Sequence, residues 1–258
     1  MNFNNFCFGV QESFDEKLVI LHSLSVTKDT DHTNSAIEHY FCYFNDDSEL
    51  DRFKIVLANA LRSVQRRKRF LVILNRESGG GRAGQVYEET VKPMLFAASC
   101  PHVLKESEYN RHIPLFASQL DKTGIDGVIL IGGDGTVNEF LNGLFSRRDW
   151  SSLQAELPIT LVPCGVKLHL AARFGVGDAS MAVFSALRGR CFSLYPIAFV
   201  QARRRFYGHS YLQICPAKRT YFKFYFLNSM PPLSAVNDSD TEMSMAASSV
   251  DSIVSKGP

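Results

Sequence analysis

The chain has 258 residues, with 28 lysines and arginines against 26 aspartates and glutamates. This length allows one large domain or two small ones, and the nearly balanced charge gives little support to nucleic-acid binding. The six cysteines form no CxxC pair and no zinc-like spacing with histidine, so reduced thiols are expected. No secretion signal opens the sequence and no apolar run is long enough to span a bilayer, so we expect a soluble cytoplasmic protein.

Two β-prone segments and one amphipathic segment come first. Residues 18–24 and 39–44 are typical of strands, and an N-cap signal at 46–49 precedes apolar residues at helical spacing. We therefore predict a small β-plus-helix module over residues 1–66. The four cations at 66–69 fit either a nucleic-acid contact or a solvated link between helix and strand, and the link is favoured because cations suit a helix C-terminus.

A buried strand at 70–75 then runs into a glycine-rich loop. Gly79, Gly81 and Gly84 spell GxGxxG, and Glu106 lies near the distance at which a dinucleotide fold places its ribose-binding acid. A nicotinamide-dependent oxidoreductase is therefore one hypothesis. It is the weakest, because the loop is long and charged and a second glycine loop is left unexplained. A Walker GxxxxGK[ST] spelling is absent from the sequence.

That second loop lies within residues 127–144, which organise the rest of the chain. An apolar run of strand length is followed by glycines, and apolar residues then recur at helical spacing. The glycines can adopt positive φ and admit a ligand's oxygens to backbone N–H groups, next to a helix N-terminus that attracts phosphate (Gly132, Gly133 and Gly135). Asp134 stands among them. Beside phosphate it would hold a metal or take a proton from a hydroxyl, and the alternative is that it only caps the helix.

Strand, loop and helix recur further along the chain. Strands are predicted at 102–105 and 158–163, a helix is entered at Pro114, and two helices are joined by residues 175–178. The pattern predicts an α/β, Rossmann-like domain over residues 67–190, with a parallel sheet whose ligands bind at the carboxyl ends of the strands. Residues 191–228 are β-rich, and the composition of residues 229–258 is typical of a disordered tail.

Four motifs resemble the diacylglycerol kinase catalytic domain, as found in sphingosine and ceramide kinases, in both order and spacing. They are residues 74–81 (LNRESGGG), 107–112 (SEYNRH), 132–139 (GGDGTVNE) and 162–165 (VPCG). The resemblance covers roughly residues 50 to 200. The N-terminal module and residues 87–93 (YEETVKP) are most similar to the eukaryotic sphingosine kinase branch.

The resemblance implies transfer of the γ-phosphate of ATP, with Mg²⁺ present, to the hydroxyl of a sphingoid base. Ceramide or diacylglycerol is the alternative acceptor. It also implies peripheral membrane contact by a cytoplasmic protein, and it makes Asp134 the residue that takes the proton from the lipid hydroxyl. The residues implied to lie around the nucleotide are Asn75, Arg76, Glu77, Ser78, Gly79, Gly80, Gly81, Ser107, Glu108, Tyr109, Asn110, Arg111, Gly133, Gly135, Thr136, Glu139 and Gly165. No protein metal ligand is predicted.

The chain departs from the family pattern in three respects. Arg76 stands where the family usually has proline, and residues 166–168 (VKL) replace a small hydroxyl residue, a glycine and an asparagine. The family's second, β-rich lobe is represented by a fragment, so we expect a chain truncated in that lobe. These departures motivate a further hypothesis, a nucleotide-binding protein of this family with weak or no catalysis.

Overall fold

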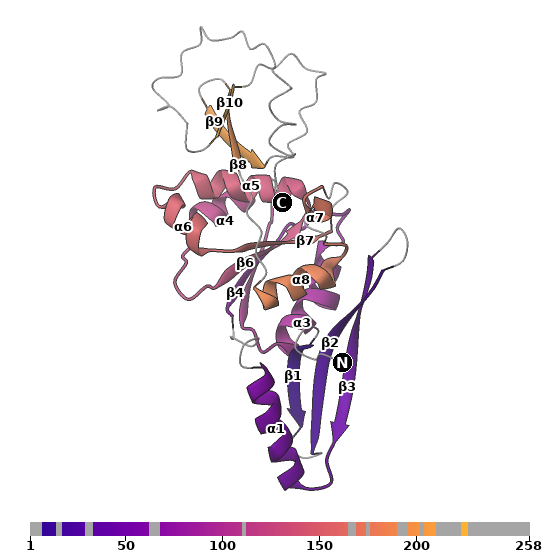
Figure 1. Ribbon diagram of the computed structural model, residues 1–258. Coiled ribbons are helices and arrows are strands. Elements are labelled where there is room, and N and C mark those ends of the chain that lie inside the picture. The colour runs from indigo at the N-terminus through magenta and orange to yellow at the C-terminus, as the bar shows by residue number, and fades with distance from the viewer. Residues whose placement is uncertain are drawn as a thin grey trace. The chain divides into compact units, whose positions relative to one another are not determined.

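The computed structural model describes residues 7–13, 17–28, 33–61, 68–109, 112–164, 169–173, 176–189, 196–201, 204–209 and 223–226. The chain divides into two compact units, residues 1–193 and 194–258. The first unit contains a three-stranded antiparallel sheet and a four-stranded parallel sheet, and the second contains a three-stranded antiparallel sheet (Figure 1). Among the helices described, none has both the length and the apolar character needed to cross a membrane.

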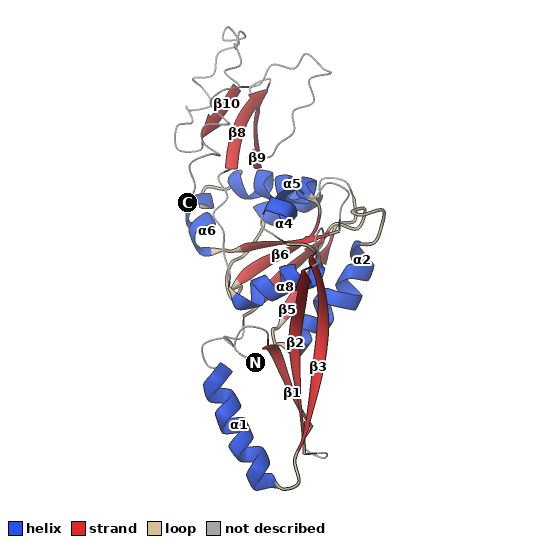
Figure 2. Cartoon of the chain, turned by 45° about the vertical axis from the view of Figure 1, so that its right-hand side comes forward, coloured by secondary structure: helices blue, strands red, loops and turns tan. Residues whose placement is uncertain are grey.

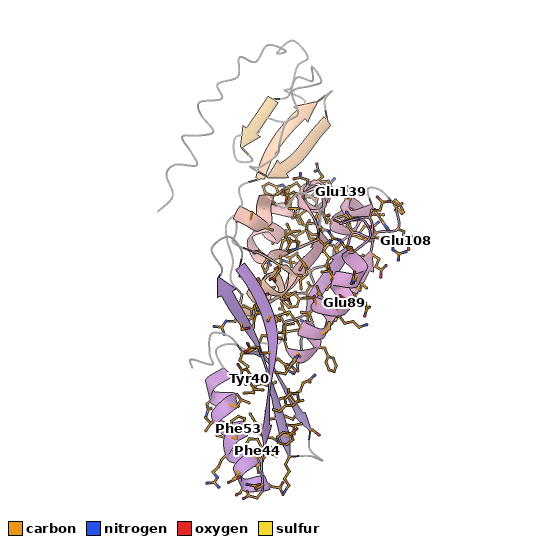
Figure 3. All side chains as sticks on the ribbon, turned by 90° about the vertical axis from the view of Figure 1, so that its right-hand side faces the viewer. Tyr40, Phe44, Phe53, Glu89, Glu108 and Glu139 are labelled. Carbon is orange, nitrogen blue, oxygen red and sulfur yellow. The ribbon has the colours of Figure 1, made fainter. Side chains whose placement is uncertain are left out.

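The N-terminal sheet is a meander of β1 (Cys7–Ser13), β2 (Leu18–Lys28) and β3 (Thr33–Tyr43), followed by α1 (Asp47–Leu61). The predicted N-cap is confirmed, since the Asp46 carboxylate accepts hydrogen bonds from the Glu49 N–H at 2.8 Å and the Ser48 hydroxyl at 2.7 Å. Figure 3 shows Phe44 and Phe53 close together where α1 packs on this sheet, and their ring centroids are 5.0 Å apart.

The parallel sheet confirms the predicted α/β fold. Its strands are β4 (Phe70–Leu74), β5 (His102–Glu106), β6 (Gly127–Gly132) and β7 (Ile159–Pro163), in the order β5-β4-β6-β7. Every residue of β4 and β6 is buried, as expected for central strands covered on both faces. Their continuous apolar sequences therefore reflect helices on both sides of the sheet.

Helices cover both faces of this sheet (Figures 1 and 2). One face packs against a continuous helical segment, α2 (Ala83–Val86), the π-helical η2 (Tyr87–Val91) and α3 (Lys92–Ala97), together with α8 (Ala179–Arg188). The other face is covered by α4 (His112–Ser118), α5 (Asp134–Phe145) and α6 (Trp150–Glu156). The short α7 (His169–Arg173) follows β7.

The two parts of the first unit share a core. Phe8 and Leu24 of the N-terminal sheet belong to the same buried cluster as Phe184 of α8 and residues of β4 and β6. The Ser35 hydroxyl also donates a hydrogen bond to the Asp178 carboxylate at 2.6 Å, just before α8 begins. The predicted module at 1–66 therefore packs directly on the α/β domain, and the predicted domain boundaries stay predictions.

Two residues of the cationic run at 66–69 are described, and both have structural partners. Lys68 Nζ donates to the backbone oxygens of Ala186 and Leu187 at the end of α8, at 2.7 and 3.0 Å. The Arg69 N–H donates to the Asp126 carboxylate at 2.8 Å. These contacts support a link between elements; residues 66 and 67 lie outside the described ranges.

The second unit contains β8 (Pro196–Gln201), β9 (Arg204–His209) and β10 (Lys223–Phe226), paired in the order β10-β8-β9. Strands were expected in this part of the chain, and those described pair in antiparallel orientation. The tail predicted at 229–258 lies outside the described residues.

Candidate active site

The loops after the strands of the parallel sheet meet at one edge. The Ser107 N–H donates to the Leu74 oxygen at 2.9 Å, the Asn75 N–H to Ile131 at 3.1 Å, and the Cys164 N–H to Gly132 at 3.0 Å. Each bond joins a residue just past one strand to the end of its neighbour. The helix after β4 lies on one face and the helix after β6 on the other, so the edge between β4 and β6 is a topological switch point, where open α/β sheets bind ligands.

The first glycine loop needs glycine for conformational reasons. Gly79, Gly80 and Gly81 all have positive φ, at +65°, +69° and +88°. A Cβ on Gly79 would lie 1.9 Å from the backbone oxygen of Cys164, which follows β7. The Gly81 N–H closes a turn by donating to the Ser78 oxygen at 3.2 Å, so the N–H groups of Gly79 and Gly80 are the glycine donors of this loop that could bind an anion. The loop after β4 is therefore pressed against the end of β7.

The second glycine loop differs from the first. Gly132, Gly133 and Gly135 are not among the glycines with positive φ, so the left-handed conformation that their lack of a Cβ allows is not adopted there. Gly132 is required by packing instead, because a Cβ there would lie 2.2 Å from Thr136 Oγ1. Gly133 is the extended N-cap of α5, and Gly135 is exposed with no atom within 4 Å of an added Cβ. The open surface at Gly135 lets a ligand approach the start of the helix.

Asp134 is the first residue of α5 and is buried, at 8% exposure. Its Oδ1 accepts a hydrogen bond from the Leu170 N–H of α7, at 3.3 Å. The carboxylate therefore lies at the positive end of a helix dipole and is oriented by the backbone of another helix. The hydrogen bond from Leu170 therefore fixes the position of this carboxylate.

A pocket opens beside these loops, with about 400 Å³ of space that includes open solvent. Its lining residues come from the ends of β4 and β5 and from α4 and α5. They are Asn75, Arg76, Glu77, Ser107, Glu108, Tyr109, Ile113 and Glu139. All of these except Ile113 were predicted to lie around a nucleotide. Figure 3 labels Glu108 and Glu139, which lie toward the same end of the parallel-sheet domain.

Hydrogen bonds hold the pocket walls together. The Arg76 N–H donates to Ser107 Oγ at 3.1 Å, and Asn75 Nδ2 donates to Thr136 Oγ1 at 3.1 Å. The Arg76 guanidinium pairs with Glu106, and this bond raises the pKa of Arg76. Glu106, the candidate ribose acid of the oxidoreductase hypothesis, is therefore paired with a cation beside the pocket.

The remaining predicted residues fall into two groups. Some lie on the same loops without lining the pocket: Ser78, Gly79, Gly80, Gly81, Gly133, Asp134, Gly135 and Thr136. Thr136, at 2% exposure, is placed to orient Asn75. The others, Asn110, Arg111 and Gly165, lie outside the described residues. Ile113 was missed, although an apolar residue in the first turn of a helix after the SEYNRH motif is a signal that could have found it.

The described residues contain no group of three or more His, Cys, Asp or Glu side chains arranged to hold a metal ion. Burial raises the pKa of the Cys164 thiol, so this side chain beneath the first glycine loop is protonated at neutral pH. The site therefore offers backbone amides, one arginine, several glutamates and the oriented carboxylate of Asp134.

Glycine loops that adjoin at a switch point beside a helix N-terminus are features with which open α/β domains bind phosphorylated ligands. Residues 69–193 match the family model described as the diacylglycerol kinase catalytic domain. This part of the chain is therefore similar to the catalytic domain of diacylglycerol kinases, and the relatives that it matches are named sphingosine kinases and sphingoid base kinases.

The relatives are longer proteins. Sphingosine kinase 1 of Arabidopsis thaliana is 32% identical over 57% of this chain and 31% of the relative. Sphingosine kinase 2 of the same plant is 35% identical over 42% of this chain and 22% of its own length. Sphingoid long chain base kinase 4 of Schizosaccharomyces pombe is 32% identical over 48% of this chain and 27% of its own. The chain thus spans less than a third of each.

Among solved structures, a diacylglycerol kinase from Bacillus anthracis str. Sterne is 16% identical. The superposition has a TM-score of 0.39 and covers 55% of this chain and 60% of that chain. We draw no conclusion from a likeness this distant.

Proposed function

We propose that this chain is an ATP-dependent lipid kinase that phosphorylates the hydroxyl group of a sphingoid base. The main supporting observation is that the loop after β4, the loop after β5 and α5 all contribute polar side chains to one pocket, next to the glycine loops. The names of the relatives, sphingosine kinases and sphingoid base kinases, supply the reaction and the acceptor class.

The nucleotide fits the chemistry of this edge. The N–H groups of Gly79 and Gly80 are backbone donors for a phosphate, whereas the Gly81 N–H is bonded to the Ser78 oxygen, and the exposed Gly135 admits a ligand to the N-terminus of α5. Asn75, Ser107 and Arg76 are tied into the wall by the bonds described above, so the polar lining is already ordered before a ligand enters. Pre-ordered donors are what phosphoryl transfer requires, because its catalysis consists mainly of positioning and charge stabilisation.

Asp134 is proposed as the acceptor of the proton that the lipid hydroxyl loses. Its carboxylate is the first side chain of α5 and is oriented by the Leu170 N–H, and a positioned carboxylate can act as a general base. Proton removal leaves the substrate oxygen as the nucleophile toward the terminal phosphate.

We also propose that Mg²⁺ accompanies ATP. The pocket lining includes Glu77, Glu108 and Glu139, whose charges oppose a triphosphate unless a cation neutralises it. Mg²⁺ bound to nucleotides is held mostly by phosphates and water with one or two carboxylates, so a dedicated protein cluster is not required. We also propose a cytoplasmic location. Peripheral membrane contact is part of the proposal because the acceptor is a lipid.

The proposal is tested with purified protein, labelled ATP, Mg²⁺ and sphingosine, ceramide or diacylglycerol in mixed micelles. Transfer to sphingosine is expected, and Asp134→Asn should lower it at least about 100-fold because the base is lost. The variant keeps an oxygen that can accept from Leu170, so its Tm and ATP affinity should be close to wild type.

Asp121→Asn is the matched control, because it makes the same chemical change on an exposed residue outside the pocket. It should leave transfer unchanged. ATP-dependent thermal stabilisation without transfer to any of the lipids would favour the non-catalytic nucleotide-binding hypothesis. Absence of any thermal shift with ATP contradicts both hypotheses, and an NADH titration monitored by fluorescence tests the oxidoreductase.

A further inference from the structure

A stack of rings lies beside the pocket, built from the loop after β5 and from α4. Tyr109 and His112 are stacked with ring centroids 4.2 Å apart and an interplanar angle of 13°. The His112 ring in turn contacts Phe116, one helical turn later, with centroids 4.1 Å apart. The three rings therefore follow one another from the pocket rim onto the helix.

Hydrogen bonding and charge hold this stack in place. His112 Nδ1 accepts a hydrogen bond from the Glu108 N–H at 3.2 Å, so in the neutral ring the proton is on Nε2. Lys105 Nζ lies 5.4 Å from the centroid of the Phe116 ring, within the range of a cation–π contact. His112 is thus restrained on both sides, by the loop backbone and by α4.

Tyr109 differs from the other two rings because it lines the pocket and is 54% exposed. One side of its ring is covered by His112, so the exposed part is available to a ligand. The other polar lining residues, Asn75, Ser107 and the glutamates, suit phosphates and hydroxyls, whereas a tyrosine ring suits a flat aromatic group. A lipid chain would need a larger apolar wall than this pocket offers.

We infer that Tyr109 is the stacking surface for the purine base of the nucleotide and that His112 is a positioning residue that holds it there. The inference rests on the proposed function, since it requires a nucleotide in this pocket. A tyrosine on an unsupported loop would lose rotamer freedom on binding, and the stack on His112 and Phe116 removes that cost beforehand. The glycine loops bind the phosphates, and the ring stack selects the base.

The test separates base from phosphate by comparing ATP with inorganic tripolyphosphate, both with Mg²⁺. Tyr109→Ala should weaken ATP binding about tenfold, the usual effect of removing one base-stacking ring, and should leave tripolyphosphate binding within about twofold. His112→Ala should weaken ATP binding in the same direction. His112→Phe, which keeps a ring between Tyr109 and Phe116, should retain most of the affinity.

A spectroscopic readout comes from Tyr109→Trp. The native chain has a single tryptophan, Trp150, which packs on Phe145 in the described structure. A tryptophan at position 109 that stacks on a base should keep ATP affinity, and ATP should quench its fluorescence whereas tripolyphosphate should not. Wild-type protein supplies the Trp150 background.

Three outcomes overturn the inference. Equal ATP affinity in wild type, Tyr109→Ala and His112→Ala would show that the ring does not contact the base, while leaving the proposed function intact. Equal losses for ATP and tripolyphosphate would show that the stack only anchors the loop. Failure of the wild-type protein to bind either ligand would remove the inference and the proposed function together.

Discussion

At the scale of single residues, Gly79 is the most constrained position of the first glycine loop. Its φ of +65° is unfavourable for other residues, and an added Cβ would meet the Cys164 backbone oxygen at 1.9 Å. We predict that Gly79→Ala lowers the free energy of unfolding by about 2 kcal/mol or more and weakens ATP binding, because the loop must move away from β7. Urea denaturation and ATP titration measure the two effects.

Two neighbouring glycines serve as controls. Gly80 has a φ of +69° but open space around an added Cβ. Gly80→Ala should therefore lower the free energy of unfolding only by the cost of placing alanine in the left-handed conformation, about 1 kcal/mol. Gly84 lies in α2 with open space, so Gly84→Ala should be neutral or stabilising by about 0.5–1 kcal/mol. If all three alanine variants had the same stability, the contact with Cys164 would have no energetic importance.

His22 makes the stability of the N-terminal sheet dependent on pH. It is buried, its Nδ1 lies 2.7 Å from His39 Nδ1, and its Nε2 has no hydrogen-bond partner within the described residues. Burial, and secondarily the charge of His39, lowers the pKa of His22 from 6.5. The folded state therefore binds a proton less readily than the unfolded chain, so stability is lost as pH falls below about 6.5 toward the lowered pKa.

We predict that Tm falls between pH 7 and about pH 5.5 and that His22→Gln reduces this fall, because glutamine does not titrate. Differential scanning fluorimetry across this range measures the effect. Limiting the measurement to pH values above about 5 avoids the titration of carboxylates such as Asp149, whose pKa is lowered by its bond to Arg147. An identical pH profile in the variant would assign the fall to other groups.

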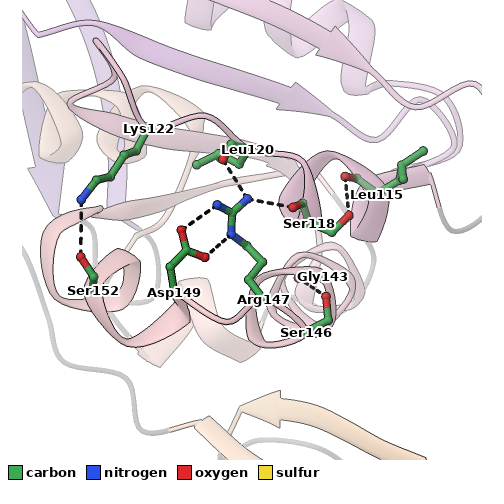
Figure 4. Close-up of polar contacts among 9 residues, drawn as sticks. All are labelled: Leu115, Ser118, Leu120, Lys122, Gly143, Ser146, Arg147, Asp149 and Ser152. Atoms are coloured by element: carbon green, nitrogen blue, oxygen red, sulfur yellow. Dashed lines mark hydrogen bonds and ion pairs between the residues drawn. The ribbon is translucent and has the colours of Figure 1, made fainter.

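At the scale of secondary-structure elements, Arg147 ties the helices of one sheet face together (Figure 4). It follows α5, and its Nη1 donates to the backbone oxygens of Ser118 and Leu120, at 2.8 Å each, where α4 ends. Its Nε and Nη2 donate to the two carboxylate oxygens of Asp149, also at 2.8 Å, just before α6. One side chain thus joins the end of α4 to the connection between α5 and α6.

We predict that Arg147→Ala lowers the free energy of unfolding by about 1–3 kcal/mol, because two half-buried carbonyl groups lose their donors. Arg147→Lys should recover only part of the loss, since an ammonium cannot reproduce the fork geometry. The pocket lies elsewhere, so ATP affinity should be unchanged. Lys92→Ala, which removes an exposed pair with Glu88 and a cation–π contact with the Tyr87 ring, is the control and should alter Tm little. An Arg147→Ala protein as stable as this control would contradict the prediction.

The elements that could be predicted are those whose sequence pattern is independent of tertiary contacts. β4 and β6 are uninterrupted apolar runs, and central parallel strands need nothing else. β1 was not predicted because it is irregular, with a register shift between Cys7 and Gly9. α6 was not predicted from the sequence, since Leu153 is the buried residue among the α6 side chains that the structure describes, and one apolar residue gives no recognisable period.

In the candidate site, too, some features could be predicted from the sequence pattern and others depend on tertiary contacts. Convergence of the glycine loops follows from parallel strands alone, so the edge could be predicted from the order of strands and helices. The conformation of Gly132 could not, because it depends on Thr136 folding back over it, and neither could the stack of Tyr109 on His112. Both are contacts between side chains and backbone that only the packed helices α4 and α5 bring into place.

At the scale of the first unit as a whole, the question is whether the N-terminal sheet and the α/β domain unfold together. Phe8 of β1 is 3% exposed and its ring lies 6.5 Å, centroid to centroid, from Phe184 of α8. Phe8 and Leu24 share a buried cluster with β4 and β6. A common core of this kind makes unfolding cooperative across both sheets, whereas a boundary at residue 66 with an independent module would not.

The fluorescence of Trp150 reports on the unfolding of the α/β domain, because Trp150 lies in α6, on the face of the parallel sheet that α4 and α5 cover. We predict that Phe8→Ala lowers the urea midpoint seen by Trp150 fluorescence by about 1 M or more, since truncating a buried phenylalanine costs about 3–5 kcal/mol. Phe41→Ala, at a position of the same sheet that is 56% exposed, should leave that midpoint nearly unchanged. If Phe8→Ala altered far-UV circular dichroism at low urea while the Trp150 transition stayed at the wild-type midpoint, the N-terminal sheet would be an independent module, and its contacts with α8 would not couple it to the nucleotide pocket.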